Sequence, residues 1–506
     1  MSHWLMAPIL LPLVTGLVLL LAARWPLARQ RSLSVVSSVA LLPLAGYLLA
    51  LSLDDGYRLY ALGNWPAPFG IVLVLDRLSA LMLALVALLA VPAVLYAVRG
   101  TDTRGRNFHA LFQFQLLGLN GAFLTGDLFN LFVFFEVLLI ASYALLLHGG
   151  GAPRSRAGLH YVVLNLIGSS LFLVAVGVLY GITGTLNMAD LAARVAQLSH
   201  DEAGLVHAGA LLLLVVFALK AALLPLYFWL PRAYAAASAP VAALFAIMTK
   251  VGVYAIVRVY SLIFGPAAGL VADTAATWLW PLALATLALG AIGALAARDL
   301  RTLIAYLVVV SVGTLLAGFA LGTPDAWAAT LYYMVHTTLV SGGLFLLAGL
   351  VRAERGTAGD GFADPHPLHQ PALLGALFFL GAVAVVGMPP LSGFIGKLLL
   401  LRATVDAVQT AWLWSVVLGS GLLALIALSR AGSLLFWRVG AVPLTGVPAD
   451  RLRVTCSAVL LASAPLLVIF AAPATDFAEA TARQLSTPAG YVSAVLGAAR
   501  APGGAP

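Results

Sequence analysis

Residues 128–147 read LFNLFVFFEVLLIASYALLL, twenty consecutive residues with a single charged side chain, Glu136. An α-helix needs roughly 20 apolar residues to cross the ~30 Å hydrocarbon core of a bilayer. The stretch therefore predicts a membrane-spanning helix with an acid near its middle. A charge at that depth costs roughly 3 kcal/mol on insertion scales, so Glu136 needs either a partner or a function.

The rest of the 506-residue chain has the same character. Hydrophobic residues make up 62% of it and charged residues 9%, with a mean hydropathy of +1.04. A soluble domain carries about 25% charged residues, so this chain cannot cover a water-facing surface. The net charge of +8 comes from basic residues scattered between apolar runs, which is typical of membrane topology and not of nucleic-acid binding. The single cysteine, Cys456, excludes an internal disulfide or a cysteine-built metal or iron–sulfur site.

We therefore expect an all-α polytopic membrane protein with fourteen transmembrane helices. The connections between them are too short to hold a soluble catalytic domain. The spans are expected near residues 4–23, 33–53, 72–98, 110–126, 128–147, 160–182, 206–230, 240–263, 276–297, 302–322, 327–351, 371–401, 409–429 and 453–472.

The basic residues predict the orientation of these spans. Loops after odd-numbered spans hold 17 of the 27 Lys and Arg residues, whereas loops after even-numbered spans and both termini hold 5. By the positive-inside rule the odd loops are cytoplasmic and both termini are external. The apolar N-terminal run precedes Arg24, the opposite order to a cleavable signal peptide, so the first span is expected to be retained.

Five ionisable residues are expected at membrane depth. They are Glu136, Lys220, Lys250, His336 and Lys397. One acid and three lysines do not neutralise one another, so a static core of paired charges is difficult to build from them. Burial lowers the pKa of an amine and raises that of a carboxyl, which brings both towards neutral pH. These five side chains, called the row below, predict a proton relay. The alternative, that they only hold helices together, stays open, above all for His336.

Proline residues predict two broken helices beside these lysines. Pro225 follows Lys220 by five residues, and Pro389 and Pro390 precede Lys397. Freed backbone at membrane depth is tolerated only against protein or water. Two broken, lysine-bearing spans five spans apart predict two five-helix repeats, and an odd repeat length makes their topologies inverted.

The chain accordingly divides into four expected parts. Residues 1–109 hold spans one to three, 110–263 the first repeat, 264–437 the second repeat, and 438–506 the last span with a C-terminal tail. Other polar residues indicate no metal site. Asp76, Arg77 and Asp127 lie at span edges, where a charge is less costly. Six histidines are expected to be solvated or interfacial: His109, His148, His160, His207, His366 and His369.

Four motifs resemble a known family. Residues 125–136 (TGDLFNLFVFFE), 160–170 (HYVVLNLIGSS), 387–394 (GMPPLSGF) and the segment 299–306 are similar to the D subunits of multisubunit Mrp-type Na⁺/H⁺ antiporters. The resemblance covers roughly residues 70–440. More distantly, the chain is similar to the antiporter-like subunits of respiratory complex I and membrane-bound hydrogenases.

The resemblance implies a proton-translocating subunit of a hetero-oligomeric Na⁺ or K⁺/proton antiporter in a bacterial cytoplasmic membrane. Such a subunit is a transporter and not an enzyme, uses no cofactor and acts with the other subunits of its complex. The resemblance also implies that Glu136 and Lys220 form a switchable pair, and that Lys250, His336 and Lys397 carry the proton onward.

Two features depart from the family pattern. The tenth span lacks serines directly after Tyr306, and Lys397 fits the antiporter D subunits better than complex I subunits with glutamate at that place. The alternative reading is a proton-pumping membrane subunit of complex I or a hydrogenase. The two readings differ only in their partners.

Overall fold

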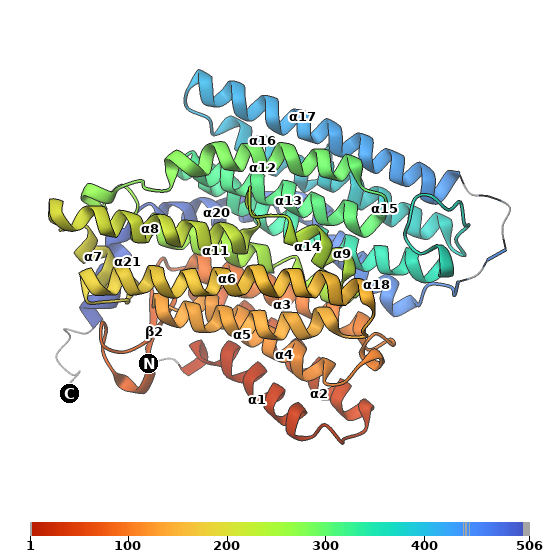
Figure 1. The fold of residues 1–506 in the computed structure, drawn as a ribbon, viewed down its shortest axis with the longest axis horizontal. Coiled ribbons are helices and arrows are strands. Elements are labelled where there is room, and N and C mark those ends of the chain that lie inside the picture. The colour runs from red at the N-terminus through yellow and green to blue at the C-terminus, as the bar shows by residue number, and fades with distance from the viewer. Residues whose placement is uncertain (1–2, 439, 441–442, 445, 499–506) are drawn as a thin grey trace.

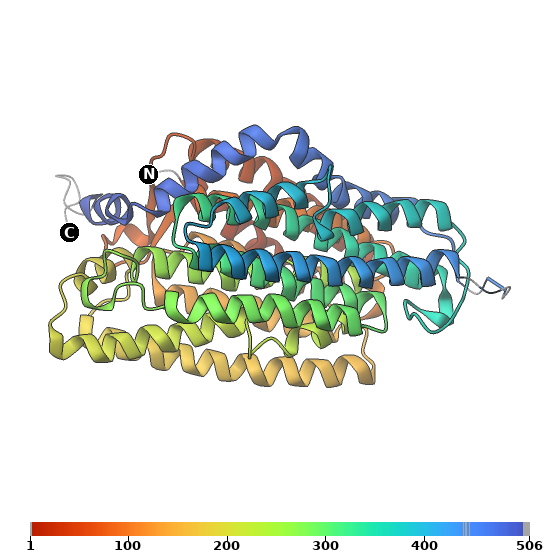
Figure 2. The same cartoon turned by 90° about the horizontal axis from the view of Figure 1, so that it is seen from above.

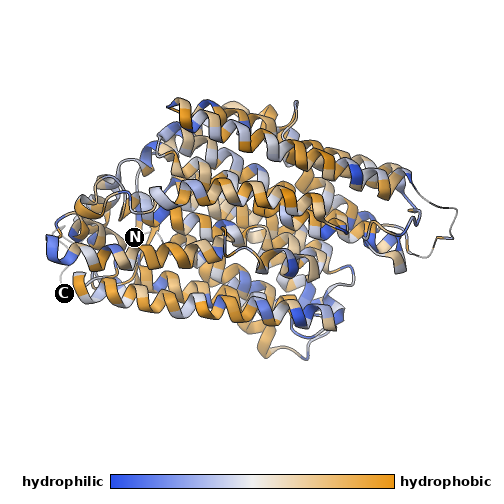
Figure 3. Cartoon of the chain, turned by 45° about the horizontal axis from the view of Figure 1, so that its top comes forward, coloured by the Kyte–Doolittle hydropathy of each residue, from blue (hydrophilic) through white to orange (hydrophobic). Residues whose placement is uncertain are grey.

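The computed structural model describes residues 3–438, 440, 443–444 and 446–498 as a bundle of helices that run side by side along its longest axis (Figure 1). The view turned by 90° keeps the same parallel arrangement (Figure 2). Apolar residues cover the helices, and hydrophilic residues gather towards the two ends of the bundle (Figure 3). Among the described residues, eleven helical segments are long and apolar enough to cross a membrane. The polytopic all-α fold is thereby confirmed.

Each of the fourteen expected spans coincides with a helix or a pair of helices. The first three are α1 (Ala7–Leu21), α2 (Leu27–Leu51) and α3 (Arg77–Ala97). The next five are α4 (Phe108–Leu124), α5 (Leu128–Leu147), α6 (Ala152–Thr183), α8 with α9 (His200–Ala221, Trp229–Ala236) and α10 with α11 (Ala239–Phe245, Met248–Leu262). The last six are α12 (Ala276–Ala296), α13 (Leu300–Ala320), α14 (Pro324–Glu354), α15 with α16 (Pro371–Val386, Ser392–Arg402), α17 (Ala407–Gly432) and α18 with α19 (Arg451–Leu461, Ser463–Ile469).

Several elements differ from the sequence-based expectation. The start of the expected third span is a strand, β2 (Val72–Leu75), paired antiparallel with β1 (Arg58–Ala61). The expected C-terminal tail contains two helices, α20 (Ala471–Leu485) and α21 (Pro488–Ala498), and α7 (Met188–Val195) is an additional short helix. Short 3-10 turns occupy His3–Leu5, Leu62–Asn64, Asp102–Arg104, Gly269–Val271 and Gly356–Ala358, and a π-helical turn, Ser433–Trp437, ends α17.

Two backbone pairings show how the halves of the bundle repeat. Asp127, which caps α5, forms a bridge with Asn187, and Asp299, which caps α13, forms one with Gly361. Gly149 lies at the end of α5 opposite to Asp127, and it lines the same cavity as Asp299. Asp127 and Asp299 therefore lie at opposite ends of the bundle. The same pairing therefore occurs once at each end of the molecule, as inverted repeats require. The exact part boundaries at residues 109, 263 and 437 stay a prediction.

Burial divides the helices into a centre and a perimeter. The whole of the α10–α11 span and nearly all of the α13 and α14 spans are buried within the protein. In contrast, α2, α6 and α17 each bury less than half of their most apolar stretch. Exposed apolar side chains over such long helices would be costly in water, whereas lipid tails accept them.

A buried ion pair at the end of the bundle that carries β2 was not expected. Asp76, placed by the sequence at a span edge where a charge is less costly, is buried, and its carboxylate lies 2.6 Å from the guanidinium of buried Arg258. The rings of Tyr254 and Tyr491 lie against the same guanidinium at 5.5 and 5.4 Å. The pair joins α3, α11 and α21, which are far apart in the sequence.

His109 and His148 also differ from expectation, because both are buried. The ring of His109 lies 3.1 Å from Asp102, which also accepts two hydrogen bonds from Arg31 at 2.6 and 2.9 Å. Burial alone would raise the pKa of the Asp102 carboxyl, but the hydrogen bonds from His109 and Arg31 hold that pKa well below its usual range. This cluster fastens α2 to the start of α4.

Replacing Arg258 by methionine should destabilise the protein by about 3–5 kcal/mol, because it leaves the Asp76 carboxylate buried without a countercharge. The double variant Asp76→Asn/Arg258→Met should recover most of the loss, since no unpaired charge remains and asparagine can still cap α3. Thermal unfolding of the purified protein in detergent measures both effects. The exposed arginine variant Arg483→Met is the matched control and should leave the transition unchanged. A single variant as stable as the control would contradict the argument.

Candidate proton pathway

Glu136 and Lys220 meet through a serine that links three helices. Glu136 lies in the middle of α5, Ser169 on α6, and Lys220 in the last turn of α8. The Ser169 hydroxyl donates a short hydrogen bond to the Glu136 carboxylate, and the Lys220 ammonium lies 3.5 Å from the same hydroxyl oxygen. The ring of Phe135 lies 6.0 Å from that ammonium. The acid and the base are thus bridged by one hydroxyl.

The Ser169 hydroxyl has a second acceptor within reach. The backbone carbonyl of Asn165 lies 3.0 Å from it. A hydroxyl carries one proton, so it donates to Glu136 or to Asn165 but not to both. When Glu136 is ionised it is the stronger acceptor, and when Glu136 is protonated the hydroxyl is free to turn to the carbonyl. The bridge can therefore follow the protonation state of the acid.

The first break places Lys220 at the end of a half-helix. Helix α8 ends at Ala221, and Ala222 adopts a left-handed conformation with φ of 62°. Pro225 lies in the irregular segment between α8 and α9. Freed backbone groups there find protein partners: the Leu219 carbonyl accepts from the Trp229 indole at 3.1 Å, and the Leu224 amide donates to Thr286 at 2.9 Å. The break is thus satisfied without the lysine, which leaves Lys220 free to contact Ser169.

Lys250 lies in the first turn of α11, where that helix crosses the end of α8. A Cβ on Gly252 would lie 2.4 Å from the Ala221 amide nitrogen, so only glycine allows this close approach. The Lys250 ammonium is fully buried and donates to the Ser311 hydroxyl of α13 at 3.0 Å. A cavity of about 10 Å³, the space of about one water molecule, lies between Lys220 and the start of α11.

The second break uses its lysine differently. Helix α15 ends at Val386, and Gly387 continues with φ of 83°, a conformation that favours glycine. Pro389 and Pro390 lie between α15 and α16, and Lys397 lies on α16. Its ammonium donates to the carbonyls of Val386 at 2.7 Å and Val385 at 3.3 Å. The free carbonyl end of a helix carries partial negative charge, so it stabilises this cation.

His336 lies on α14, in the expected second repeat. It is buried, and its Nδ1 lies 2.8 Å from the Ser392 hydroxyl at the start of α16. Its ring is 5.6 Å from the ring of Tyr333, centroid to centroid. The histidine thus touches the helix that carries Lys397, and its tautomer is set by which way the Ser392 hydroxyl points.

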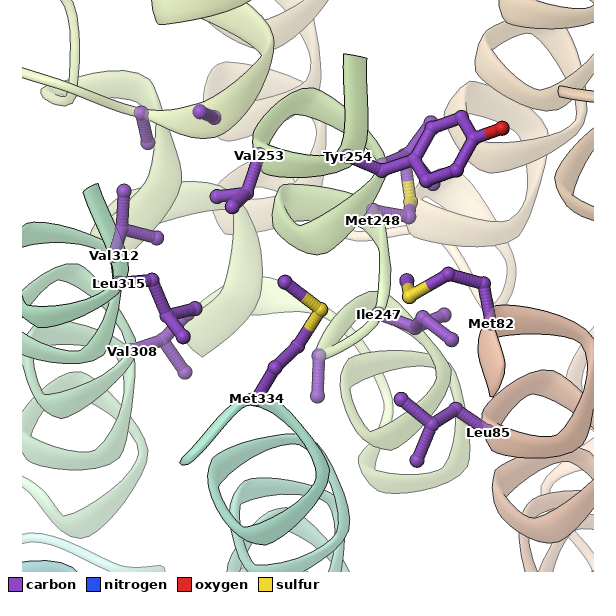
Figure 4. Close-up of a cluster of buried hydrophobic side chains, with 14 of the residues drawn as sticks. Met82, Leu85, Ile247, Met248, Val253, Tyr254, Val308, Val312, Leu315 and Met334 are labelled. Atoms are coloured by element: carbon purple, nitrogen blue, oxygen red, sulfur yellow. The ribbon is translucent and has the colours of Figure 1, made fainter. Parts of the chain in front are cut away.

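The side chains packed around the middle of the row are apolar. Met334 of α14 lies in one cluster with Ile247 and Met248 of the α10–α11 span and with Val308 of α13 (Figure 4). Among the described residues no direct hydrogen bond joins Lys220 to Lys250, or Ser311 to His336. A proton that crosses these gaps needs bridging water.

The row reaches the perimeter of the bundle at both of its ends. Lys220, Lys250 and His336 are buried, as the sequence predicts, but Glu136 and Lys397 are only partly buried. The helices that carry them, α5 and α16, lie on opposite sides of the bundle (Figure 1). The expectation of burial therefore holds for the three central members of the row, whereas each terminal member faces outward in part.

Three serines contact the expected residues and were not singled out from the sequence: Ser169, Ser311 and Ser392. Ser169 and Ser392 lie within the motifs 160–170 and 387–394. The sequence signal was therefore present for two of them, but a serine in an apolar helix gives no indication of which side chain it faces. Among the described residues no group of three His, Cys, Asp or Glu side chains could hold a metal ion.

The chain is similar to proteins of a known family. Residues 125–424 match the family described as “NADH:quinone oxidoreductase/Mrp antiporter, TM”. A protein of Rhizobium meliloti (strain 1021), named as the D subunit of a probable K(+)/H(+) antiporter, is 43% identical over 99% of both chains. A protein of Bacillus subtilis (strain 168), named as the D subunit of a Na(+)/H(+) antiporter, is 40% identical over 78% of this chain and 80% of the relative.

A chain of the Mrp complex from Dietzia sp. DQ12-45-1b has a similar fold. Its TM-score is 0.86 at 28% identity, over 98% of this chain and all of that one. The matched region contains all five residues of the row and both broken helices. On these grounds the chain belongs to the NADH:quinone oxidoreductase/Mrp antiporter family of membrane proteins.

Proposed function

We propose that this chain is the proton-translocating subunit of a hetero-oligomeric monovalent cation/proton antiporter. The observation that carries the proposal is the bridge from Glu136 through Ser169 to Lys220. An acid and a base that share one hydroxyl at membrane depth can exchange protonation states, which a purely structural ion pair has no need to do. Two relatives named as antiporter D subunits, one for K⁺ and one for Na⁺, support Na⁺ or K⁺ as the exchanged cation.

The order of proton transfer follows from the charges along the row. Protonation of Glu136 removes the negative charge that stabilises the Lys220 cation, so that lysine then releases its proton. The proton then passes to Lys250, a step that requires bridging water, and Ser311 accepts a hydrogen bond from the Lys250 ammonium. His336 and Lys397 complete the route towards α16.

The two ends of the row support a multisubunit assembly. Glu136 and Lys397 are partly exposed in the single chain. A charged side chain that faces hydrocarbon is costly, so other subunits of the complex are expected to cover both places. This is the physical reason why the chain would need its partners for activity.

The second candidate function is a proton-pumping subunit of a redox complex. The family description includes NADH:quinone oxidoreductase, and the relay chemistry would be the same. The relative that matches over 99% of this chain is named as part of an antiporter, which favours the antiporter. Identification of the co-purified subunits by mass spectrometry separates the two.

The proposed location is the bacterial cytoplasmic membrane, with both termini on the external side. The first 3-10 turn and β1 are in contact through His3 and Tyr60, and α21 reaches the adjacent Tyr57 through Tyr491, so the first and last described elements share one end of the bundle. Most arginines lie in loops or near the ends of helices at the other end of the bundle. The positive-inside rule supports a cytoplasmic position for the arginine-rich end.

Glu136→Gln should reduce antiport to the level of membranes without the complex, because glutamine cannot change its protonation state. Glu136→Asp keeps an ionisable carboxyl and should retain part of the activity. Formation of a pH gradient in membrane vesicles measures both, with complex assembly checked by co-purification. Wild-type transport by an assembled Glu136→Gln complex would refute the proposed role.

Lys220→Arg separates a fixed charge from proton release. Arginine keeps the positive charge but does not give up its proton, since its pKa lies above about 12. We expect antiport to fall at least roughly tenfold, as when a positioned proton donor is removed, and Lys220→Ala to behave similarly. Arginine is bulkier, so assembly must be shown to be normal. Near-normal transport would make Lys220 a fixed countercharge.

The orientation can be tested with single cysteines in a Cys456→Ala background. Gln197→Cys lies in the expected external loop after α6, and Ser155→Cys lies in the expected cytoplasmic segment at the start of α6. A membrane-impermeant maleimide should label the first in intact cells and the second only after permeabilisation. The reverse pattern, or labelling of both from outside, would show that the orientation is wrong.

A further inference from the structure

A large basic cavity at the arginine-rich end of the bundle has no part in the proton row. Its volume is about 950 Å³, within the usual range for a ligand site. Side chains from the loops before α4 and α6 and from α6, α9, α13 and α14 meet there, so both five-helix repeats contribute. Its basic residues are Arg104, Arg154, Arg156, Arg232, Arg301 and Arg352.

Few acidic groups balance these arginines. Asp299 lines the cavity but caps α13, and Asp360 pairs with Arg301 at 2.9 Å. Arg154 donates to the backbone carbonyls of Ala236 and Gly150. The remaining arginines have no carboxylate oxygen within 4.0 Å among the described residues; they are Arg104, Arg156, Arg232 and Arg352. The cavity therefore holds an excess of positive charge that the protein itself does not neutralise.

The start of α6 adds to this positive potential. The helix begins after Gly149–Gly151, all three with positive φ, and has no side-chain cap. Pro153 has no amide hydrogen, but the amides of Ala152 and Arg154 are free to bind an anion, and the helix dipole places partial positive charge there. Arg154 and Arg156 lie near this same positive end, an arrangement that is unfavourable unless an anion is present.

An apolar stripe continues from the cavity along the outer face of α6. Arg156 lies on the same face as Leu159, Val163 and Ile167, whose exposed fractions are 68%, 47% and 52%. Leu159 comes three residues after Arg156, about 5 Å along the axis. Charge at the end of a span followed directly by exposed apolar surface is the pattern that a membrane lipid requires, with its phosphate above and its acyl chains below.

We propose that this cavity binds the phosphate headgroup of an anionic membrane lipid, whose acyl chains lie against the outer face of α6. Guanidinium groups match phosphate oxygens in geometry and charge, and four arginines of the cavity are available to bind the phosphate. The bound headgroup ties the start of α6 in the first repeat to α13 and α14 in the second.

The test uses the complex purified in mild detergent, delipidated and titrated with phosphatidylglycerol or phosphatidylcholine, with bound lipid counted by native mass spectrometry. We expect selective retention of phosphatidylglycerol, weakened on the order of tenfold or more in Arg156→Gln/Arg352→Gln. Arg24→Gln/Arg29→Gln is the matched control, because it removes two exposed arginines at the same end but outside the cavity. Wild-type binding by this control supports the proposal.

Three results would overturn the assignment. Equal retention of both lipids, or an equal loss of phosphatidylglycerol binding in the two double variants, would show only non-specific attraction between lipid and protein. Thermal stabilisation by inorganic phosphate that matches the effect of phosphatidylglycerol would assign the cavity to a free anion. Cross-links from these arginines to carboxylates of another subunit would assign it to a protein partner.

Discussion

A polar group at membrane depth must find its partner within the protein, and the middle of this bundle is arranged around that requirement. Two spans are interrupted, so backbone carbonyls and amides that a continuous helix would pair are freed where no bulk water can reach them. In the first break, the Trp229 indole and the Thr286 hydroxyl satisfy the backbone. In the second break, the Lys397 ammonium does so.

The two halves therefore differ in how they hold their lysines, although their architecture repeats. Lys397 is held by two carbonyls at the end of a half-helix, whereas Lys220 has a long contact to a serine that also bonds to Glu136, and the Phe135 ring lies beside it. Under the proposed function, Lys220 is the lysine whose charge depends on the protonation state of Glu136. Inverted repeats thus supply a common geometry, and the two breaks differ in which groups satisfy their backbone.

The same requirement explains the buried charges outside the row. Asp76 and Arg258 are tolerated because each is the other's partner, with two tyrosine rings around the guanidinium. Asp102 is tolerated because His109 and Arg31 both bond to it. These clusters hold α2, α3, α4, α11 and α21 together, while Glu136 and Lys397 at the perimeter remain incompletely covered in the single chain.

The sequence by itself determined the membrane class, the fourteen spans, the two breaks and the spans that carry the five ionisable residues, because hydropathy, proline and charge act locally along the chain. Only the tertiary structure decided which groups meet: Ser169 with Glu136 and Lys220, Ser311 with Lys250, Ser392 with His336, and Asp76 with Arg258. The residues of each such contact are 33 to 182 positions apart. No local periodicity encodes a contact of that kind, since it depends on how separate helices pack against one another.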